Sequence, residues 1–167
     1  EGMGRLFNIL VRPSLEYAAA IWAPFCSETL LRDINAVQLE FGRLILRLPP
    51  STALVFILRE LGLESMQQRY LQFQLRFYGY LSKLGINRLA GLIFSNQNNR
   101  VDSGETKLSW SHALKPQLLS RASLASAWRL RSVPIGWNQH VKTLIKNEGL
   151  SASIRESASK SSLLSYN

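Results

Sequence analysis

The side chains that most often carry catalysis are few and scattered in this chain. It has two aspartates, Asp33 and Asp102, two histidines, His112 and His140, and one cysteine, Cys26. Phosphoryl transfer by two metal ions needs several carboxylates that converge on ions about 4 Å apart, and neither aspartate has an acidic neighbour at that spacing. The histidines lack Cys or Asp companions, and Cys26 follows an apolar Pro-Phe pair, which is typical of an inert thiol. We therefore predict no metal site, no cofactor and no catalytic activity for the chain itself.

Known catalytic and metal-binding sequence patterns are also missing. The sequence has no glycine-rich phosphate loop, no nucleophile elbow and no HExxH pair. A single cysteine excludes an internal disulfide framework and any zinc site built from paired thiolates. These exclusions favour a binding or structural role over an enzymatic one.

The charge of the chain is unevenly distributed. Its 167 residues include 20 Lys and Arg against 11 Asp and Glu, a net charge of +9. Residues 1–64 carry −1 and residues 65–167 carry +10, and no Asp or Glu occurs in 65–101 or 106–147. A potential of this kind attracts polyanions, so we predict a nucleic-acid partner. The alternative is a basic surface that only keeps the protein soluble.

The apolar content is sufficient for a folded core but not for a membrane span. Hydrophobic residues make up 46% of the chain, which argues against general disorder. The longest apolar run, 17–26, has ten residues, whereas a spanning helix needs about 20. The N-terminus shows no secretory signal pattern. We expect an intracellular protein of the cytoplasm and nucleus that does not enter a membrane.

Apolar residues recur every three or four positions along most of the chain, which is the period of amphipathic helices. No alternating strand pattern occurs. We therefore predict an all-α fold, an irregular bundle of about six to eight helices with a mobile Ser-rich C-terminal tail. The expected helices are 4–22 with a kink at Pro13, 27–48 capped by Ser27, 51–60 capped by Ser51 and ended by Gly62, 66–84, a short one at 87–94, 116–131, and 134–148 ended by Gly149.

One line of polar residues on the expected helix 66–84 suits binding to phosphates. Arg69, Gln72, Arg76 and Lys83 recur at spacings that keep them on one face. Cations repeated along a helix can follow a nucleic-acid backbone without reading its sequence. The alternative is the ordinary solvated face of a bundle helix.

Two other groups are secondary candidates for nucleic-acid contact. Arg43 and Arg47 lie one turn apart, although Glu40 is placed to pair with Arg43. Trp128 and Trp137 lie among Arg and Lys residues and are candidates for base stacking. The preferred interpretation is that these tryptophans anchor small helices to the core.

Three short motifs follow one another over residues 9–84. The run 11–24 (VRPSLEYAAAIWAP) contains Pro-x-Leu-x-Tyr and ends in Ile-Trp-Ala-Pro, and the stretch 58–70 (LRELGLESMQQRY) contains Leu-x-x-Leu-x-Leu-x-Ser. Together they resemble the segment after the palm of LINE-type retrotransposon reverse transcriptases. This chain departs from the family pattern with Met66 for a Leu and Tyr70 for an Arg. The family's helix with a Leu-x-x-Ile/Val-Gln core and a basic continuation is matched in order by Ile34, Val37, Gln38, Arg43 and Ile45.

This resemblance implies a noncatalytic fragment of an RNA-directed DNA polymerase polyprotein whose catalytic aspartates lie upstream. It implies a thumb-like helical domain at 1–95, a polar hinge at 96–109, a basic helical extension at 110–150 and a tail at 151–167. The expected partners are RNA, DNA or an RNA–DNA hybrid and the remainder of the polyprotein, with sequence-independent template-primer binding as the function. The alternatives are a helical protein–protein interaction module and the product of a decayed element without function.

Overall fold

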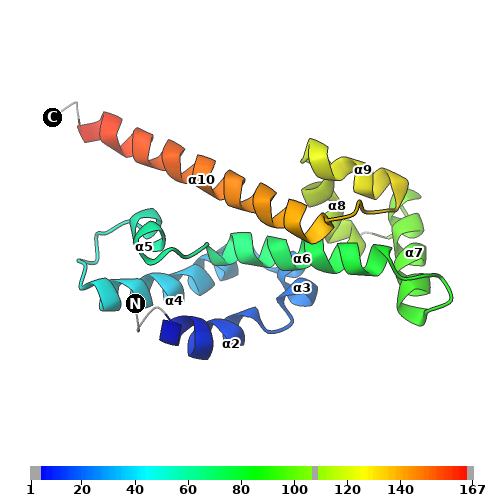
Figure 1. The fold of residues 1–167 in the computed structure, drawn as a ribbon, viewed down its shortest axis with the longest axis horizontal. Coiled ribbons are helices and arrows are strands. Elements are labelled where there is room, and N and C mark those ends of the chain that lie inside the picture. The colour runs from blue at the N-terminus through cyan, green and yellow to red at the C-terminus, as the bar shows by residue number, and fades with distance from the viewer. Residues whose placement is uncertain (1–4, 107–108, 165–167) are drawn as a thin grey trace. The chain divides into compact units, whose positions relative to one another are not determined.

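A computed structural model describes residues 5–106 and 109–164. Residues 1–4, 107–108 and 165–167, which include the start of the predicted helix 4–22, part of the hinge and the end of the tail, lie outside the described residues. At 156–157 and 159–164 only the backbone is described. Within these ranges the chain is helical and contains no strand, so the all-α prediction is confirmed. The elements, drawn in Figure 1, are the π-helical turn η1 (Phe7–Val11), α2 (Arg12–Glu16), α3 (Ala19–Trp22), the 3-10 turn η2 (Ala23–Phe25), α4 (Glu28–Leu46), α5 (Leu54–Leu61), α6 (Met66–Ser82), α7 (Leu89–Asp102), α8 (Trp110–Leu119), α9 (Ala122–Leu130) and α10 (Trp137–Leu164).

The helices form two compact units, and each unit is discontinuous in sequence. The first unit comprises Glu1–Tyr17, Ser27–Leu71 and Lys142–Asn167. The second unit comprises Ala18–Cys26 and Gln72–Val141. The domains expected from the sequence were consecutive, whereas these units share α6 and α10 between them.

The expected helix 4–22 is interrupted at its proline and again near its middle. Pro13 has no N–H to donate to the carbonyl four residues earlier, and the preceding turn η1 closes with a wider bond from the Arg12 N–H to the Phe7 carbonyl. A second break follows α2, where Ala18 takes a left-handed conformation with φ 51°.

The signals predicted for α4 and α5 are confirmed at three of four termini. The Ser27 hydroxyl accepts a bond from the Leu30 N–H, and α4 ends at Leu46, before Pro49-Pro50. Gly62 ends α5 in a left-handed conformation with φ 64°. Ser51 does not cap α5, because it belongs to a turn closed by the Thr52 N–H on the Pro49 carbonyl, and Ala53 takes the cap position.

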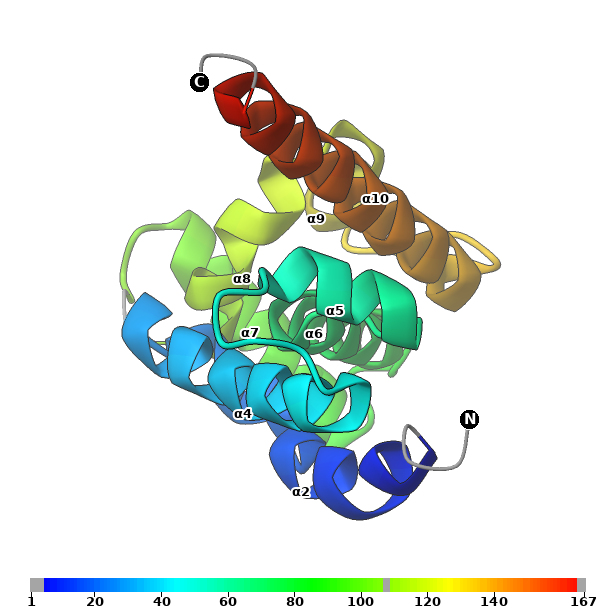
Figure 2. The same ribbon diagram turned by 90° about the vertical axis from the view of Figure 1, so that its left-hand side faces the viewer.

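The buried face of α4 is not the apolar face that its sequence predicts. Asn35, Gln38 and Gly42 are its buried residues. Gly42 allows close contact with Ile57 of α5, which packs on α4 (Figures 1 and 2). The predicted apolar positions are Leu30, Ile34, Val37, Phe41, Leu44, Ile45 and Leu48, and none of them is fully buried.

The second unit contains a helix where the sequence predicted a loop. Residues 95–102 belong to α7, which extends eight residues beyond the expected end at Phe94. The buried residues of α7 recur at helical spacing: Gly91, Phe94, Asn98 and Val101. The amide-rich positions between them face solvent, so a polar composition concealed an amphipathic helix.

The C-terminal half departs from the expected helix boundaries at two places. The expected helix 116–131 is two helices, because α8 begins at Trp110 with Ser109 as its cap, contains Pro116 in its interior, and stops before α9. Gly149 does not end the last helix, and α10 continues to Leu164 through the predicted tail. A side chain at position 149 would collide with Gln68, so this glycine permits close packing within the first unit.

Candidate nucleic-acid interface

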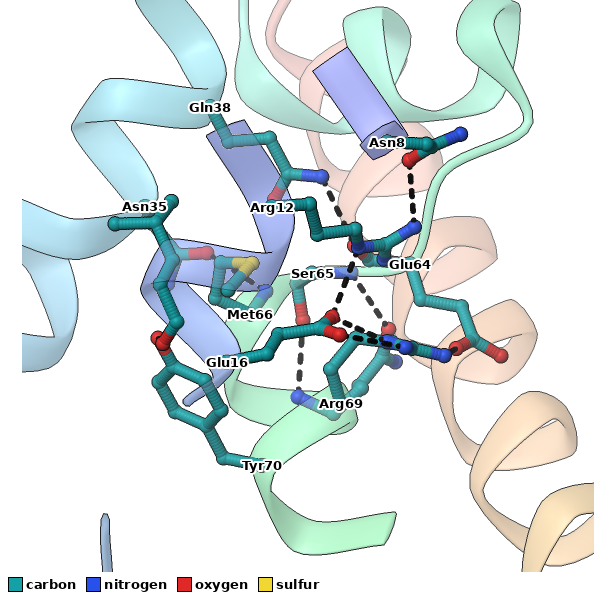
Figure 3. Close-up of polar contacts among 12 residues, drawn as sticks. Asn8, Arg12, Glu16, Asn35, Gln38, Glu64, Ser65, Met66, Arg69 and Tyr70 are labelled. Atoms are coloured by element: carbon teal, nitrogen blue, oxygen red, sulfur yellow. Dashed lines mark hydrogen bonds and ion pairs between the residues drawn. The ribbon is translucent and has the colours of Figure 1, made fainter. Parts of the chain in front are cut away.

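Arg69, the first cation of the predicted line, is bound to two carboxylates. Its Nε and one terminal nitrogen donate to the two Glu16 carboxylate oxygens at 2.8 and 2.9 Å (Figure 3). Glu64 lies 3.7 Å from the other terminal nitrogen. The hydrogen bond to Glu16 is the main cause that raises the pKa of Arg69 above its ordinary value. A bidentate pair of this kind is among the stronger side-chain contacts in proteins, so Arg69 serves the fold of the first unit.

Arg12 completes this cluster, which we call the charge cluster and define as Arg12, Glu16, Glu64 and Arg69. The Arg12 Nε lies 2.9 Å from Glu16, and another Arg12 nitrogen donates to the Asn8 side chain at 3.0 Å (Figure 3). Burial, and next the positive charge of Arg69, lower the pKa of Arg12. The cluster therefore contains two guanidinium groups that depend on Glu16 between them.

Uncharged hydrogen bonds fix the backbone around the charge cluster. The Tyr70 hydroxyl donates to the Leu15 carbonyl at 2.7 Å, and the Asn35 side chain accepts from the Met66 N–H at 3.0 Å. The Gln38 side chain donates to the Glu64 carbonyl at 3.1 Å. These bonds tie α2 and α4 to the start of α6 within the first unit.

The remaining members of the predicted line are in different environments. Gln72 is buried, Arg76 is half-buried and Lys83 is exposed. Arg69 and Gln72 therefore do not present the phosphate-binding strip that their spacing predicted. The physical reason is that α6 is surrounded on most sides, so even its polar line is largely covered.

The two secondary arginines also differ from each other. Arg43 donates to Glu40 at 2.7 Å, as its spacing predicted, and to the Thr52 carbonyl at 3.1 Å. Arg47 is exposed at the end of α4, where it takes a left-handed conformation with φ 51°.

Both candidate base-stacking tryptophans are inside the second unit. Trp137 is buried, and its indole N–H donates to the Leu75 carbonyl at 2.7 Å. Trp128 is buried as well, and its N–H donates to Asp102 at 3.1 Å. Neither ring is open to a base, and the preferred interpretation, that they anchor helices to the core, describes their arrangement.

Asp102 is the centre of a second polar cluster, which sequence reasoning missed. It accepts from Lys115 at 3.0 Å, from Trp128 and from Arg131. The Arg131 guanidinium lies 4.7 Å from the Trp128 ring centroid and the Lys115 ammonium 5.5 Å from it, distances suited to cation–π attraction. Asp102 thereby connects α7, α8 and the end of α9. Its partners lie 13–29 residues away in the sequence, so no local pattern reveals them.

The Asp102 cluster predicts a loss of stability in acid. Desolvation alone would raise the pKa of Asp102, but bonds from Lys115 and Trp128 and the charge of Arg131 outweigh it and place the pKa below its ordinary value. A lowered folded-state pKa stabilises the fold above the ordinary value, and this contribution is lost as the pH falls through the folded value. We expect Asp102→Asn to lower the free energy of unfolding by about 1 kcal/mol at neutral pH. Urea titrations should show that the difference from the parent disappears in acid; a difference independent of pH would contradict this origin.

The positive charge of the protein is concentrated in the second unit. This unit contains nine Lys and Arg residues against Asp102 and Glu105, a net charge of +7 out of +9. Both carboxylates are occupied, since Glu105 lies 3.5 Å from Arg100. Among the described residues, four cations of the second unit have no carboxylate at ion-pair distance, and we call them the unpaired cations: Arg76, Lys83, Arg88 and Arg129. Of these, Lys83, Arg88 and Arg129 are exposed.

Within the described part of the chain, no three His, Cys, Asp or Glu side chains gather in a way that could hold a metal ion. None of the described helices is both long and apolar enough to cross a membrane. Comparisons with protein-family models, curated proteins and solved structures found no match.

Proposed function

We propose that this chain is a noncatalytic helical module that binds the phosphate backbone of RNA, DNA or their hybrid without reading sequence. The observation that carries the proposal is the second unit's net charge of +7, with both of its carboxylates already engaged. No acidic side chain of that unit remains to compete with a phosphate for the unpaired cations.

The physical basis is the release of counterions from nucleic acid. Each phosphate that a Lys or Arg neutralises releases condensed ions, and affinity then falls steeply with salt. Lys83 and Arg88 flank the start of α7, and Arg129 lies in α9, so the exposed cations come from separate elements. Contacts from several elements hold a duplex by its backbone and carry no base preference.

The resemblance to the region after the palm of LINE-type reverse transcriptases agrees with this proposal. The chain would contribute template-primer binding to a polyprotein whose polymerase aspartates lie elsewhere, and the remainder of that polyprotein would be its partner. It would act inside the cell, in the cytoplasm and nucleus. The cations that serve this role are those of the second unit rather than Arg69.

The test compares two triple charge reversals of equal size. The variant Lys83→Glu, Arg88→Glu, Arg129→Glu changes the unpaired cations. The control Arg5→Glu, Arg32→Glu, Arg59→Glu changes three exposed arginines of the first unit, whose N-terminal and central segments have balanced charge. Electrophoretic shift of a duplex at several salt concentrations measures both. We expect the first variant to bind more weakly and to lose about 0.9 of salt slope per phosphate contact, and the control to bind like the parent.

Equal loss in both variants would show that only the overall charge matters and would overturn the proposed interface. The second candidate function is a protein–protein interaction module, which the exposed apolar side chains of the first unit favour. It predicts no duplex binding at low salt and self-association that is insensitive to salt.

A further inference from the structure

One apolar line on α4 faces solvent. Leu30, Val37 and Leu44 are spaced seven residues apart and are 46%, 44% and 72% exposed. Positions seven apart lie on the same side of a helix, with a drift of about 20° per step. They therefore form a continuous exposed line of large aliphatic side chains along α4, on a surface that contains no described partner for them.

The orientation of α4 that exposes this line is determined by specific contacts on the opposite side. Asn35 and Gln38 bond to the backbone of residues 64–66, and Gly42 admits Ile57. Rotating α4 to bury the apolar line would break both side-chain bonds and separate Gly42 from α5. The exposed line is thus a consequence of contacts that hold the first unit together.

Charged residues flank the apolar line in an order that is complementary to itself. Asp33 lies near the start of α4 and Arg47 at its end, and both are exposed. They are 14 residues apart, about 21 Å along a helix, so they cannot pair with each other in one chain. Among the described residues neither has an ion-pair partner.

We propose that the exposed line of α4 binds a second copy of this chain, with the two α4 helices antiparallel. A twofold axis near the middle of α4 places Val37 beside Phe41 of the second copy, and Asp33 beside its Arg47. Such an interface is isologous, so the Asp33–Arg47 pair forms twice. A nucleic acid is a poor occupant, because Asp33 and Glu40 border the line.

The strength expected of this contact is modest. A pair of 19-residue helices presents less surface than the roughly 800 Å² per partner of a standard stable complex. We therefore expect association at micromolar concentrations, detectable by sedimentation or light scattering over a series of concentrations. The apolar line predicts that Val37→Ser with Leu44→Ser abolishes it. The matched control Ile135→Ser removes a fully exposed aliphatic side chain of the second unit and should leave association unchanged.

A charge-swap cycle tests the antiparallel arrangement. Asp33→Arg alone and Arg47→Asp alone should each weaken association at least tenfold, since each places like charges together. The combined variant should recover to within about threefold of the parent. Aspartate is also among the residues that tolerate the left-handed conformation at position 47. Circular dichroism of each variant confirms that the helices are retained.

A chain that stays monomeric over the whole concentration series would overturn the proposal. Recovery that fails in the combined variant would overturn the antiparallel arrangement. These readouts are independent of duplex binding, because the α4 variants leave the unpaired cations intact and the reversals in the second unit leave α4 intact.

Discussion

Replacing Trp137 by alanine is expected to lower the free energy of unfolding by about 4 kcal/mol, the largest effect of any single substitution considered. The indole is fully enclosed, and its ring packs against Tyr78 with centroids 6.3 Å apart. Gly79 lies so close that a side chain there would collide with the ring. Truncation would leave a cavity and also deprive the Leu75 carbonyl of its donor at 2.7 Å. Urea unfolding followed by circular dichroism measures the loss.

Trp137→Phe separates the two causes of this loss. Phenylalanine fills much of the space but cannot donate to Leu75, so we expect about 2 kcal/mol from the unsatisfied carbonyl and the smaller ring. Leu150→Ala, at an exposed position of α10, serves as the control and should cost less than about 1 kcal/mol. A Trp137→Ala variant as stable as that control would show that the indole does not anchor the second unit.

Glu16→Gln is expected to lower the free energy of unfolding by about 3 kcal/mol. The substitution leaves Arg12 and Arg69 close together in a partly buried place, with only Glu64 to balance them, 3.7 Å from Arg69. Their mutual repulsion already contributes to the lowered pKa of Arg12. The bidentate bonds to Arg69 are lost at the same time.

The matched control is Glu40→Gln, which removes an exposed ion pair with Arg43 and should cost about 0.5 kcal/mol. A second substitution, Arg69→Gln, tests the coupling in a double-mutant cycle. If Arg69 repels Arg12 once Glu16 is neutral, then removing Arg69 should recover part of the loss. Strict additivity of the two substitutions would contradict the pairing.

The elements of this fold that could be predicted from sequence are those governed by neighbouring residues. Ser27 caps α4 because its hydroxyl meets an N–H only three residues away, and Gly62 ends α5 because it enters the left-handed region without strain. The pairing of Arg43 with Glu40 also follows from a spacing of three. Signals of this range are written in the sequence itself.

The elements that could not be predicted depend on distant partners. Arg69 looked like a solvent-facing cation because Glu16 lies 53 residues before it. The amides of Asn35 and Gln38 looked polar and exposed, yet their partners 31 and 26 residues later draw them inside. Gly149 looked like a helix terminator because the sequence does not show that Gln68 lies against it. In each case a tertiary contact decided what the local pattern left open.

The discontinuity of the first unit has a consequence for biosynthesis. Its segments come from both ends of the chain, with Lys142–Asn167 completing what Glu1–Tyr17 begins. A ribosome must therefore deliver nearly the whole chain before this unit can close, whereas the second unit ends at Val141 and has all its residues earlier. The acidic N-terminal half must wait, unfinished, while the strongly basic unit assembles beside it on the emerging polypeptide.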